Sequence, residues 1–359
     1  MPFKISPYHI LPWLCAAVLA AGLMLPMSGV LLGVSLVALI AAVGVGVHHA
    51  EVIAHRVGEP YGTLVLALSV TIIEAALIIS MMIVGGEKSA SVARDAIYGA
   101  VMVIVTGVVG LCLLVGGWHH REQTFRLEGT NAGMAALAVM AGLVLVMPSL
   151  TISAPGARYS GSQLAFVALG SLALWLAFIF FQTVRHREFF LPEEGAGDQA
   201  HAEGESPTTR SALVSFGLLV VALVSVVGLA KLMSPSLEAL VSNWALPQTV
   251  VGVVIAVIVL LPESYAAVRA ARANRLQTSM NLAIGSALAC IGLTVPVVVV
   301  AALWLDLPLN LGLASKDIGM LTLTFVMSAF TLGAGRTNFM QGAVHVVMFA
   351  AFLFLTLEP

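Results

Sequence analysis

The chain has 359 residues, of which 60% are hydrophobic and only 9% are charged. Soluble globular domains carry about 25% charged residues, so this composition excludes a soluble catalytic domain and indicates an integral membrane protein surrounded by the lipid bilayer. The formal net charge of -2 argues against nucleic acid as a partner.

Apolar windows separated by polar breaks predict eleven membrane-spanning helices. In chain order the predicted spans are residues 10–26, 30–49, 62–84, 96–117, 131–150, 161–184, 211–233, 247–268, 279–304, 315–333 and 340–356. The pattern predicts an all-α polytopic membrane protein. Its one long connection, 185–210, is rich in Gly, Pro and acidic residues, as flexible linkers are. It is either a solvated tether or a means of concentrating cations.

The distribution of Lys and Arg predicts the orientation of these spans. Connections on the N-terminal side hold the larger set: Lys4, Arg56, Arg121, Arg126, Arg185, Arg187, Arg210, Arg269, Arg272, Arg275 and Arg336. Connections on the other side hold only Lys88, Arg94, Arg158, Lys231 and Lys316. Because loops rich in Lys and Arg stay in the cytoplasm, we expect a cytoplasmic N-terminus and a C-terminus outside.

Two carboxylates lie within otherwise apolar spans, Glu74 in 62–84 and Glu263 in 247–268. A charge at mid-membrane costs about 2.5–3.5 kcal/mol on insertion scales, and such residues typically mark ion or proton pathways. We therefore predict that Glu74 and Glu263 form one site for a cation and protons. Permanently protonated glutamates that stabilise helix contacts are the alternative.

The predicted spans also form an internal repeat. Glu74 and Glu263 are 189 residues apart, and Gly99 and Gly285 are 186 apart. Each repeat has five spans, an odd number, so the two repeats run in opposite directions through the membrane, as in secondary transporters. The predicted organisation is an N-terminal helix (1–28), a first repeat (29–184), the acidic cytoplasmic linker (185–210) and a second repeat (211–359).

Polar groups near the two glutamates are candidate supporting ligands. Ser69 and Thr71 precede Glu74 in its span. Pro262 precedes Glu263 and is expected to break or kink that helix, because proline lacks an N–H and clashes with the preceding turn. The carbonyls freed in this way, together with carboxylates and hydroxyls, are the ligands that hard cations prefer.

Neighbouring spans contribute a second group of polar residues. Asn281 and Ser286 in the ninth span are predicted to reach the site. Asp95, near the start of the fourth span, is expected to be solvated or to cap its helix. Gly99 and Gly285 are expected to be close-packing positions rather than ligands.

Histidines supply a third group of candidates. His48, Glu51 and His55 share one helical face, at spacings of three and seven residues. They form either a polar helix end at headgroup level, a route of entry for cations or protons, or a metal site. His345, within the last predicted span, is either a packed, hydrogen-bonded histidine or part of a proton path.

Two motifs resemble a known family. GEPYGTLVLALSVTIIEAALI at 58–78 and LLPESYAAVRAARANRLQTSMNLAIGSALACIGLTVP at 260–296 resemble the two α-repeats of the calcium/cation antiporter superfamily, in its cation/proton exchanger branch. The resemblance is strongest to bacterial ChaA-type sodium(calcium)/proton antiporters. It implies a bacterial inner-membrane antiporter that exports Ca2+ or Na+, or K+, for protons by alternating access, with Glu74 and Glu263 as shared ligands.

The sequence departs from that family in places that bear on the choice of cation. The calcium-selective branch has Gly-Asn-Ala-x-Glu in both repeats, whereas this chain has Thr71 and Leu260 at the two Asn positions. The second repeat's Gly-Ser-Ser-x-Gln is also replaced by the residues 285–289. The loss of amide oxygens is expected to weaken calcium coordination and keeps sodium and potassium in play.

The sequence therefore predicts a transporter, not an enzyme, that binds transported ions and no cofactor. Two other classes stay open. A cation channel would use the same acidic residues but would not need an inverted repeat. An intramembrane metal-dependent enzyme would rest on His48, Glu51 and His55. The sequence leaves the oligomeric state and the exchange stoichiometry open.

Overall fold

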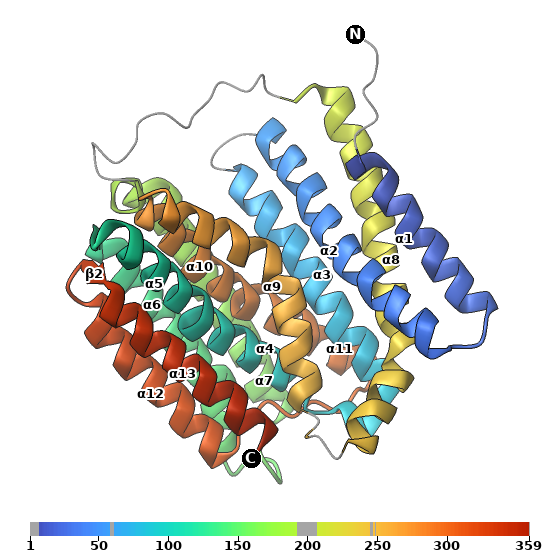
Figure 1. The fold of residues 1–359 in the computed structure, drawn as a ribbon. Coiled ribbons are helices and arrows are strands. Elements are labelled where there is room, and N and C mark those ends of the chain that lie inside the picture. Colours follow the sequence, from blue (N-terminus) through green and yellow to red (C-terminus); the bar gives the residue numbers. More distant parts are fainter. Residues whose placement is uncertain (1–6, 58–60, 192–206, 245–246, 248, 359) are drawn as a thin grey trace. The chain divides into compact units, whose positions relative to one another are not determined.

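The computed structural model describes residues 7–57, 61–191, 207–244, 247 and 249–358 (Figure 1). Ten helices of this part of the chain are long and apolar enough to cross a membrane. The eleventh predicted span corresponds to helix α12 (Ser315–Leu332), whose first turn contains Lys316 and Asp317. The prediction of an all-α polytopic membrane protein is confirmed. Residues 58–60 of the first family motif and most of the predicted linker (192–206) lie outside the described residues.

The chain forms two compact units that alternate along the sequence. Unit 1 consists of Met1–Ser89 and Glu203–Gln248, and unit 2 of Ala90–Ala202 and Thr249–Pro359. These units divide the chain differently from the two predicted repeats, which stay a prediction. We describe each unit by itself.

Unit 1 is built around a pair of long helices. Its elements are α1 (Pro7–Met24), α2 (Gly29–Val57), α3 (Tyr61–Gly85), the 3-10 turn η1 (Gly86–Ser89) and α8 (Thr209–Asn243). Helices α2 and α8 make the most extensive contact, and α1 and α3 each pack on both. The sequence explains the pairing, because α2 has small residues every four positions, and all of them are buried: Ala38, Ala42, Gly46 and Ala50.

Unit 2 holds the other helices. Its first half contains α4 (Val92–Met102), η2 (Val103–Val108), α5 (Val109–His120), β1 (Glu122–Thr124), α6 (Leu127–Ala141), η3 (Gly142–Val146), η4 (Met147–Ser149), α7 (Gly161–Phe180), η5 (Phe181–Arg185) and η6 (Arg187–Phe190). Its second half contains α9 (Thr249–Arg272), α10 (Leu276–Ala289), η7 (Cys290–Thr294), α11 (Val295–Trp304), α12, β2 (Arg336–Asn338) and α13 (Phe339–Leu357). The short strands β1 and β2 pair antiparallel, with Gln123 opposite Thr337.

Several helices of unit 2 contain π turns, in which the backbone bonds reach five residues back instead of four. These turns are η2, η3, η5 and η7. Because η2 and η7 connect regular helices, they lie within single long spans, Val92–His120 and Leu276–Trp304. These two spans are the most buried ones, at 83% and 67% of their apolar windows. They form the core of unit 2 and contact each other where α10 meets η2.

Some predicted helix boundaries are wrong. Helix α2 continues eight residues past the predicted end at 49, so the polar stretch that holds His55 is helical. Helix α8 continues past Pro235 to Asn243. The expected break at Pro262 is absent, because α9 is one continuous helix that includes this proline. The hydroxyl of Ser264 donates to the Leu260 carbonyl at 2.6 Å in the same turn.

Candidate functional site

Glu74 lies in the middle of α3 in unit 1 and is 6% exposed. Ile73, Ala75 and Leu77 next to it are buried as well, so the carboxyl group is surrounded by apolar side chains. Thr71 is buried three residues earlier, which places it on the same helical face as Glu74. Ser69 is also buried but lies further round the helix. The structure therefore gives Glu74 one hydroxyl neighbour on its own face.

Glu263 lies in α9 in unit 2, and its side chain is half-buried. The buried residues of α9 include Gly252, Ala256, Val259 and Ala267, which recur at helical spacing. Glu263 falls in this stripe between Val259 and Ala267, so it is on the face of α9 that packs inward.

The inward face of α9 packs closely on α4. A Cβ atom added at Gly252 would lie 2.7 Å from the Cβ of Asp95. One added at Gly99 would lie 3.3 Å from the Cα of Val253 and 3.5 Å from the Cβ of Ala256. The two helices therefore run side by side in the same direction. For Gly99, the expectation of close packing is confirmed.

Gly285 differs from Gly99, although the two correspond in the predicted repeat. A Cβ added at Gly285 would meet no atom within 4 Å among the described residues. The expectation of a close-packing glycine is wrong at this position, because α10 turns this part of its surface toward open space.

Asn281 and Ser286 lie on α10 in unit 2. The amide nitrogen of Asn281 donates to the carbonyl of Phe190 at 2.7 Å, and its amide oxygen accepts from Gln277 at 2.8 Å. Asn281 thus connects α10 to η6. Ser286 is half-buried one turn before η7. A role for either residue as a cation ligand stays a prediction.

Asp95 corrects the sequence-based interpretation most clearly. It is 3% exposed rather than solvated, because α9 packs over it at Gly252. Its carboxylate accepts from the Arg94 guanidinium at 2.7 Å and from the Ser91 hydroxyl at 3.2 Å. Arg94 also donates to the carbonyl of Gly312 at 3.1 Å. This buried ion pair ties the start of α4 to the segment before α12.

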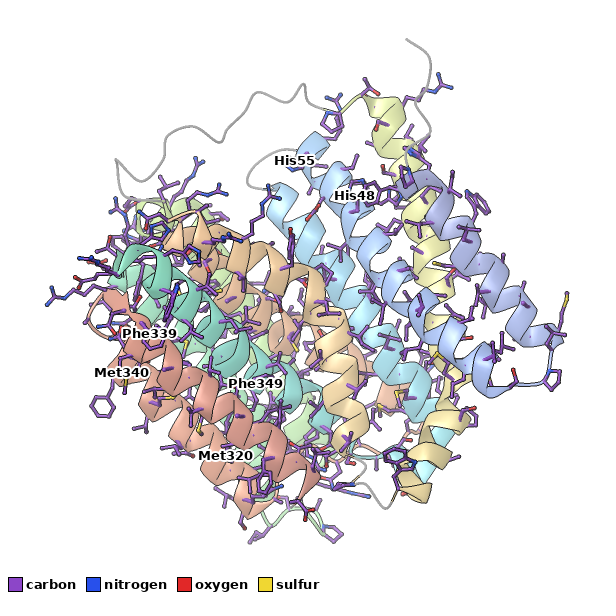
Figure 2. The ribbon with its side chains drawn as sticks, viewed as in Figure 1. His48, His55, Met320, Phe339, Met340 and Phe349 are labelled. Carbon is purple, nitrogen blue, oxygen red and sulfur yellow. The ribbon has the colours of Figure 1, made fainter. Side chains whose placement is uncertain are left out.

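The histidine-rich end of α2 is also arranged differently from the expectation. His48 stacks on Tyr8 of α1, with ring centroids 3.9 Å apart, whereas Glu51 and His55 are exposed (Figure 2). Within the described residues, no three His, Cys, Asp or Glu side chains lie close enough to hold a metal ion. The metal-site interpretation of this cluster therefore has no support.

His49 is a residue that sequence reasoning missed. It is buried, and its ring nitrogens lie 3.3 Å from the Ser215 hydroxyl and 3.0 Å from the Tyr8 carbonyl. It therefore joins α2 to both α1 and α8. Only its place next to His48 in the sequence could have pointed to it.

His345 on α13 is fully buried. Its Nδ1 lies 2.8 Å from the Val105 carbonyl in η2, and its Nε2 lies 2.7 Å from the Thr331 hydroxyl on α12. The structure thus gives His345 hydrogen-bond partners on two other spans of unit 2. Of the predicted residues, it is the one with the most defined surroundings.

Comparison with known proteins places these features in a family. The model of the sodium/calcium exchanger protein family matches residues 27–184 and 214–357. The chain is 46% identical to the putative ionic transporter y4hA of Sinorhizobium fredii, over 96% of this chain and 93% of that protein. It is 35% identical to the sodium-potassium/proton antiporter ChaA of Escherichia coli, over 90% of this chain and 88% of that protein.

Solved structures show the same fold at low sequence identity. Native YfkE matches with a TM-score of 0.74 and 18% identity, covering 98% of this chain and all of that one. The H+/Ca2+ exchanger CAX matches with a TM-score of 0.70 and 14% identity, covering 97% of this chain and 89% of that one. The family match and the identity to full-length relatives lead to one conclusion: the chain belongs to the sodium/calcium exchanger protein family.

Proposed function

We propose that the chain is a secondary antiporter that exchanges a cation for protons across the membrane. The observation that carries this proposal is the 35% identity, over 90% of the chain, to a sodium-potassium/proton antiporter. The buried carboxyl group of Glu74 fits this function, since a transporter needs a site that a proton or a cation can neutralise in turn. A transporter, not an enzyme, is the class to which these relatives belong.

Glu74 and Glu263 are the proposed ligands that protons and the cation share. A charged carboxylate is costly in apolar surroundings unless a counter-charge is present. Glu74, enclosed by apolar side chains, is therefore expected to hold a proton whenever it holds no cation. This competition couples the two fluxes, because binding of one ion requires release of the other. Thr71, on the same face of α3, is the proposed supporting ligand.

Sodium and potassium are the proposed cations, with calcium as a further candidate. The related antiporter is named for sodium and potassium, whereas the calcium-exchanging YfkE and CAX are similar in fold alone. Calcium takes six to eight oxygen ligands. Thr71 and Leu260 supply only one hydroxyl oxygen between their side chains.

Two π turns support the proposed repeat. The turn η2 begins at Val103 and η7 begins at Cys290, a separation of 187 residues. This separation falls between that of the two glycines and that of the two glutamates. A backbone irregularity that recurs at the repeat distance is expected if both halves have a common ancestor.

We also propose an orientation in a bacterial inner membrane, with the N-terminus in the cytoplasm. The asymmetry of Lys and Arg between the two sets of loops supports it. Both full-length relatives named above are bacterial. Glu51 and His55, exposed at the end of α2, would then face the cytoplasm, where they could serve as an entry point for cations.

Everted membrane vesicles provide the test. Respiration acidifies their interior, and addition of a transported cation dissipates the pH gradient, which a fluorescent dye reports. We expect sodium or potassium to do so in the wild type but not in Glu74→Gln or Glu263→Gln. Glu128→Gln is the matched control, since Glu128 is exposed at the start of α6. Normal exchange in either of the first two variants would contradict the two-carboxylate proposal.

A further inference from the structure

One carbonyl in the core of unit 2 has lost its usual helical partner. In an α-helix, the N–H of Val109 would bond to the carbonyl of Val105. In η2, that N–H bonds to the carbonyl of Ile104, five residues back. The Nδ1 atom of His345 lies 2.8 Å from the Val105 carbonyl and takes the place of the missing donor. Since a carbonyl can only accept, Nδ1 must carry a proton.

The other ring nitrogen of His345 is held in a way that tolerates a change of charge. Its Nε2 lies 2.7 Å from the Thr331 hydroxyl, which also lies 3.0 Å from the Met327 carbonyl. The hydroxyl can donate to a neutral ring, or turn to Met327 and accept from a protonated ring. No heavy atom needs to move, so the bond to Val105 is independent of the charge on the ring.

Further contacts fix α13 against the π turn. A Cβ added at Gly107, inside the turn, would lie 3.2 Å from the ring of Phe349, which Figure 2 labels on α13. One added at Gly110, just after the turn, would lie 2.8 Å from the Cβ of His345. His345 and Phe349 are four residues apart and so share one face of α13. This face covers one side of η2.

Helix α9 also contacts η2. Gly252 of α9 lies beside Asp95 of α4, and Ala256 lies beside Gly99. When this register is continued along two parallel helices, Glu263 lies level with Thr106 and Gly107, inside the π turn. The π turn therefore lies between the face of α13 that carries His345 and the stripe of α9 that carries Glu263.

We propose that His345 is a positioning residue for transport, which fixes the π turn η2 and thereby the packing of this span against α9 around Glu263. The inference rests on the proposed function, in which Glu263 binds the cation and the proton. Each residue of an α-helix advances the chain by about 100°. Return of the π turn to α-helix would therefore rotate α4 against α5 and turn Asp95 and Gly99 away from α9.

Three substitutions separate the two sides of the imidazole ring. His345→Asn places an amide N–H near the position of Nδ1 and keeps a donor for Val105. His345→Gln reaches toward the position of Nε2 and loses that donor. Thr331→Val removes the hydroxyl beside Nε2 and preserves the shape of its side chain. The half-saturating cation concentration, the maximal rate and the pH profile are measured for each in everted vesicles.

We expect His345→Gln to raise the half-saturating concentration about tenfold, since a buried carbonyl is left without its donor. His345→Asn and Thr331→Val are expected to stay within about twofold of the wild type. The pH profile of His345→Asn is expected to match the wild type, because the ring holds the turn without titrating. Size-exclusion chromatography in detergent reports whether each variant is folded.

Three results would overturn the inference. One is a loss of maximal rate alone, equal in His345→Asn and His345→Gln, which indicates packing. Another is a shifted pH profile in His345→Asn, which indicates a proton carrier. If His345→Gln does not accumulate, a loss of exchange in His345→Asn is the third. Glu263→Gln separates the two proposals: normal exchange in that variant contradicts the proposed function, whereas an inactive Glu263→Gln beside an unaltered His345→Gln contradicts only the positioning role.

Discussion

The spans Val92–His120 and Leu276–Trp304 have the same plan but different neighbours. Both are buried helices interrupted by one π turn. At η2, α13 supplies a hydrogen-bond donor and an aromatic ring. At η7, a Cβ added at Gly292 would meet the side chain of Trp175 on α7, with its Cγ at 2.7 Å. The comparison teaches that the backbone irregularity recurs along the chain, whereas the contacts that hold it do not.

The two spans also differ at the glycine that precedes each π turn. Gly99 is pressed against the backbone of α9, whereas Gly285 faces open space among the described residues. The starts of the spans differ as well. Asp95 at the start of α4 is held by Arg94, whereas Gln277 at the start of α10 accepts from the backbone N–H of Arg126 at 2.6 Å. Substitutions at these positions test how unequal the two spans are.

The largest effect is expected from Gly110→Ala, just after η2. The new Cβ would lie 2.8 Å from the Cβ of His345 and 3.0 Å from the backbone nitrogen of Val346. Because neither atom can move without shifting α13, we expect a loss of about 3 kcal/mol in stability. Thermal melting of the purified protein in detergent measures it. An unchanged melting temperature would show that α5 and α13 are not packed as described.

Arg94→Gln is expected to have the next largest effect. It leaves the buried carboxylate of Asp95 without its cationic partner, which costs about 2 kcal/mol once the 20% exposure of the Arg94 side chain is allowed for. Arg336→Gln is the matched control, because its ion pair with Glu122 is 69% and 56% exposed and contributes about 0–1 kcal/mol. Equal melting temperatures for the two variants would contradict a structural role for the Arg94–Asp95 pair.

Gly99→Ala tests the packed glycine of the first span. Its Cβ would lie 3.3 Å from the Cα of Val253, which is tight against backbone. Alanine favours a helix by about 1 kcal/mol over glycine, so the clash must exceed this gain. We expect a net loss of about 1 kcal/mol, seen as a modestly lower melting temperature. A higher melting temperature would mean that α9 can move away without cost.

Gly285→Ala is expected to have the smallest effect, and one of opposite sign. The new methyl group meets no described atom within 4 Å, so only the helix propensity changes. We expect a gain of up to about 1 kcal/mol. The contrast with Gly99→Ala is the decisive comparison, and a destabilised Gly285→Ala would remove it.

Much of the fold could be predicted because hydropathy follows from composition alone. The polar breaks around residues 27–29, 151–160 and 305–314 separate the helices about where the structure does. The π turns could not be predicted, since a shift of one hydrogen bond in VIVTGV or CIGLT needs no particular side chain. The pairing of β1 with β2 was equally hidden, because each strand is only three mostly polar residues long.

The candidate site could be predicted only in part. Glu74 stood out because a charge is rare in so apolar a span, and the structure places it in apolar surroundings. Asp95 was misjudged because its position near a helix end suggested solvent, whereas Gly252 lets α9 cover it. The partners of His345 could not be foreseen, since Val105 and Thr331 are far from it in sequence or carry no distinctive chemistry.

The pairing of α2 with α8 has a mechanical consequence. Helices usually lock together because ridges of large side chains fill grooves on the partner. The stripe of Ala38, Ala42, Gly46 and Ala50 is nearly smooth, and Ala222 of α8 faces it at Gly46. Two smooth surfaces can slide along each other while few side chains change rotamer. We expect this contact to act as a low-friction bearing, with which the first helices of the two predicted repeats can shift at little cost in free energy.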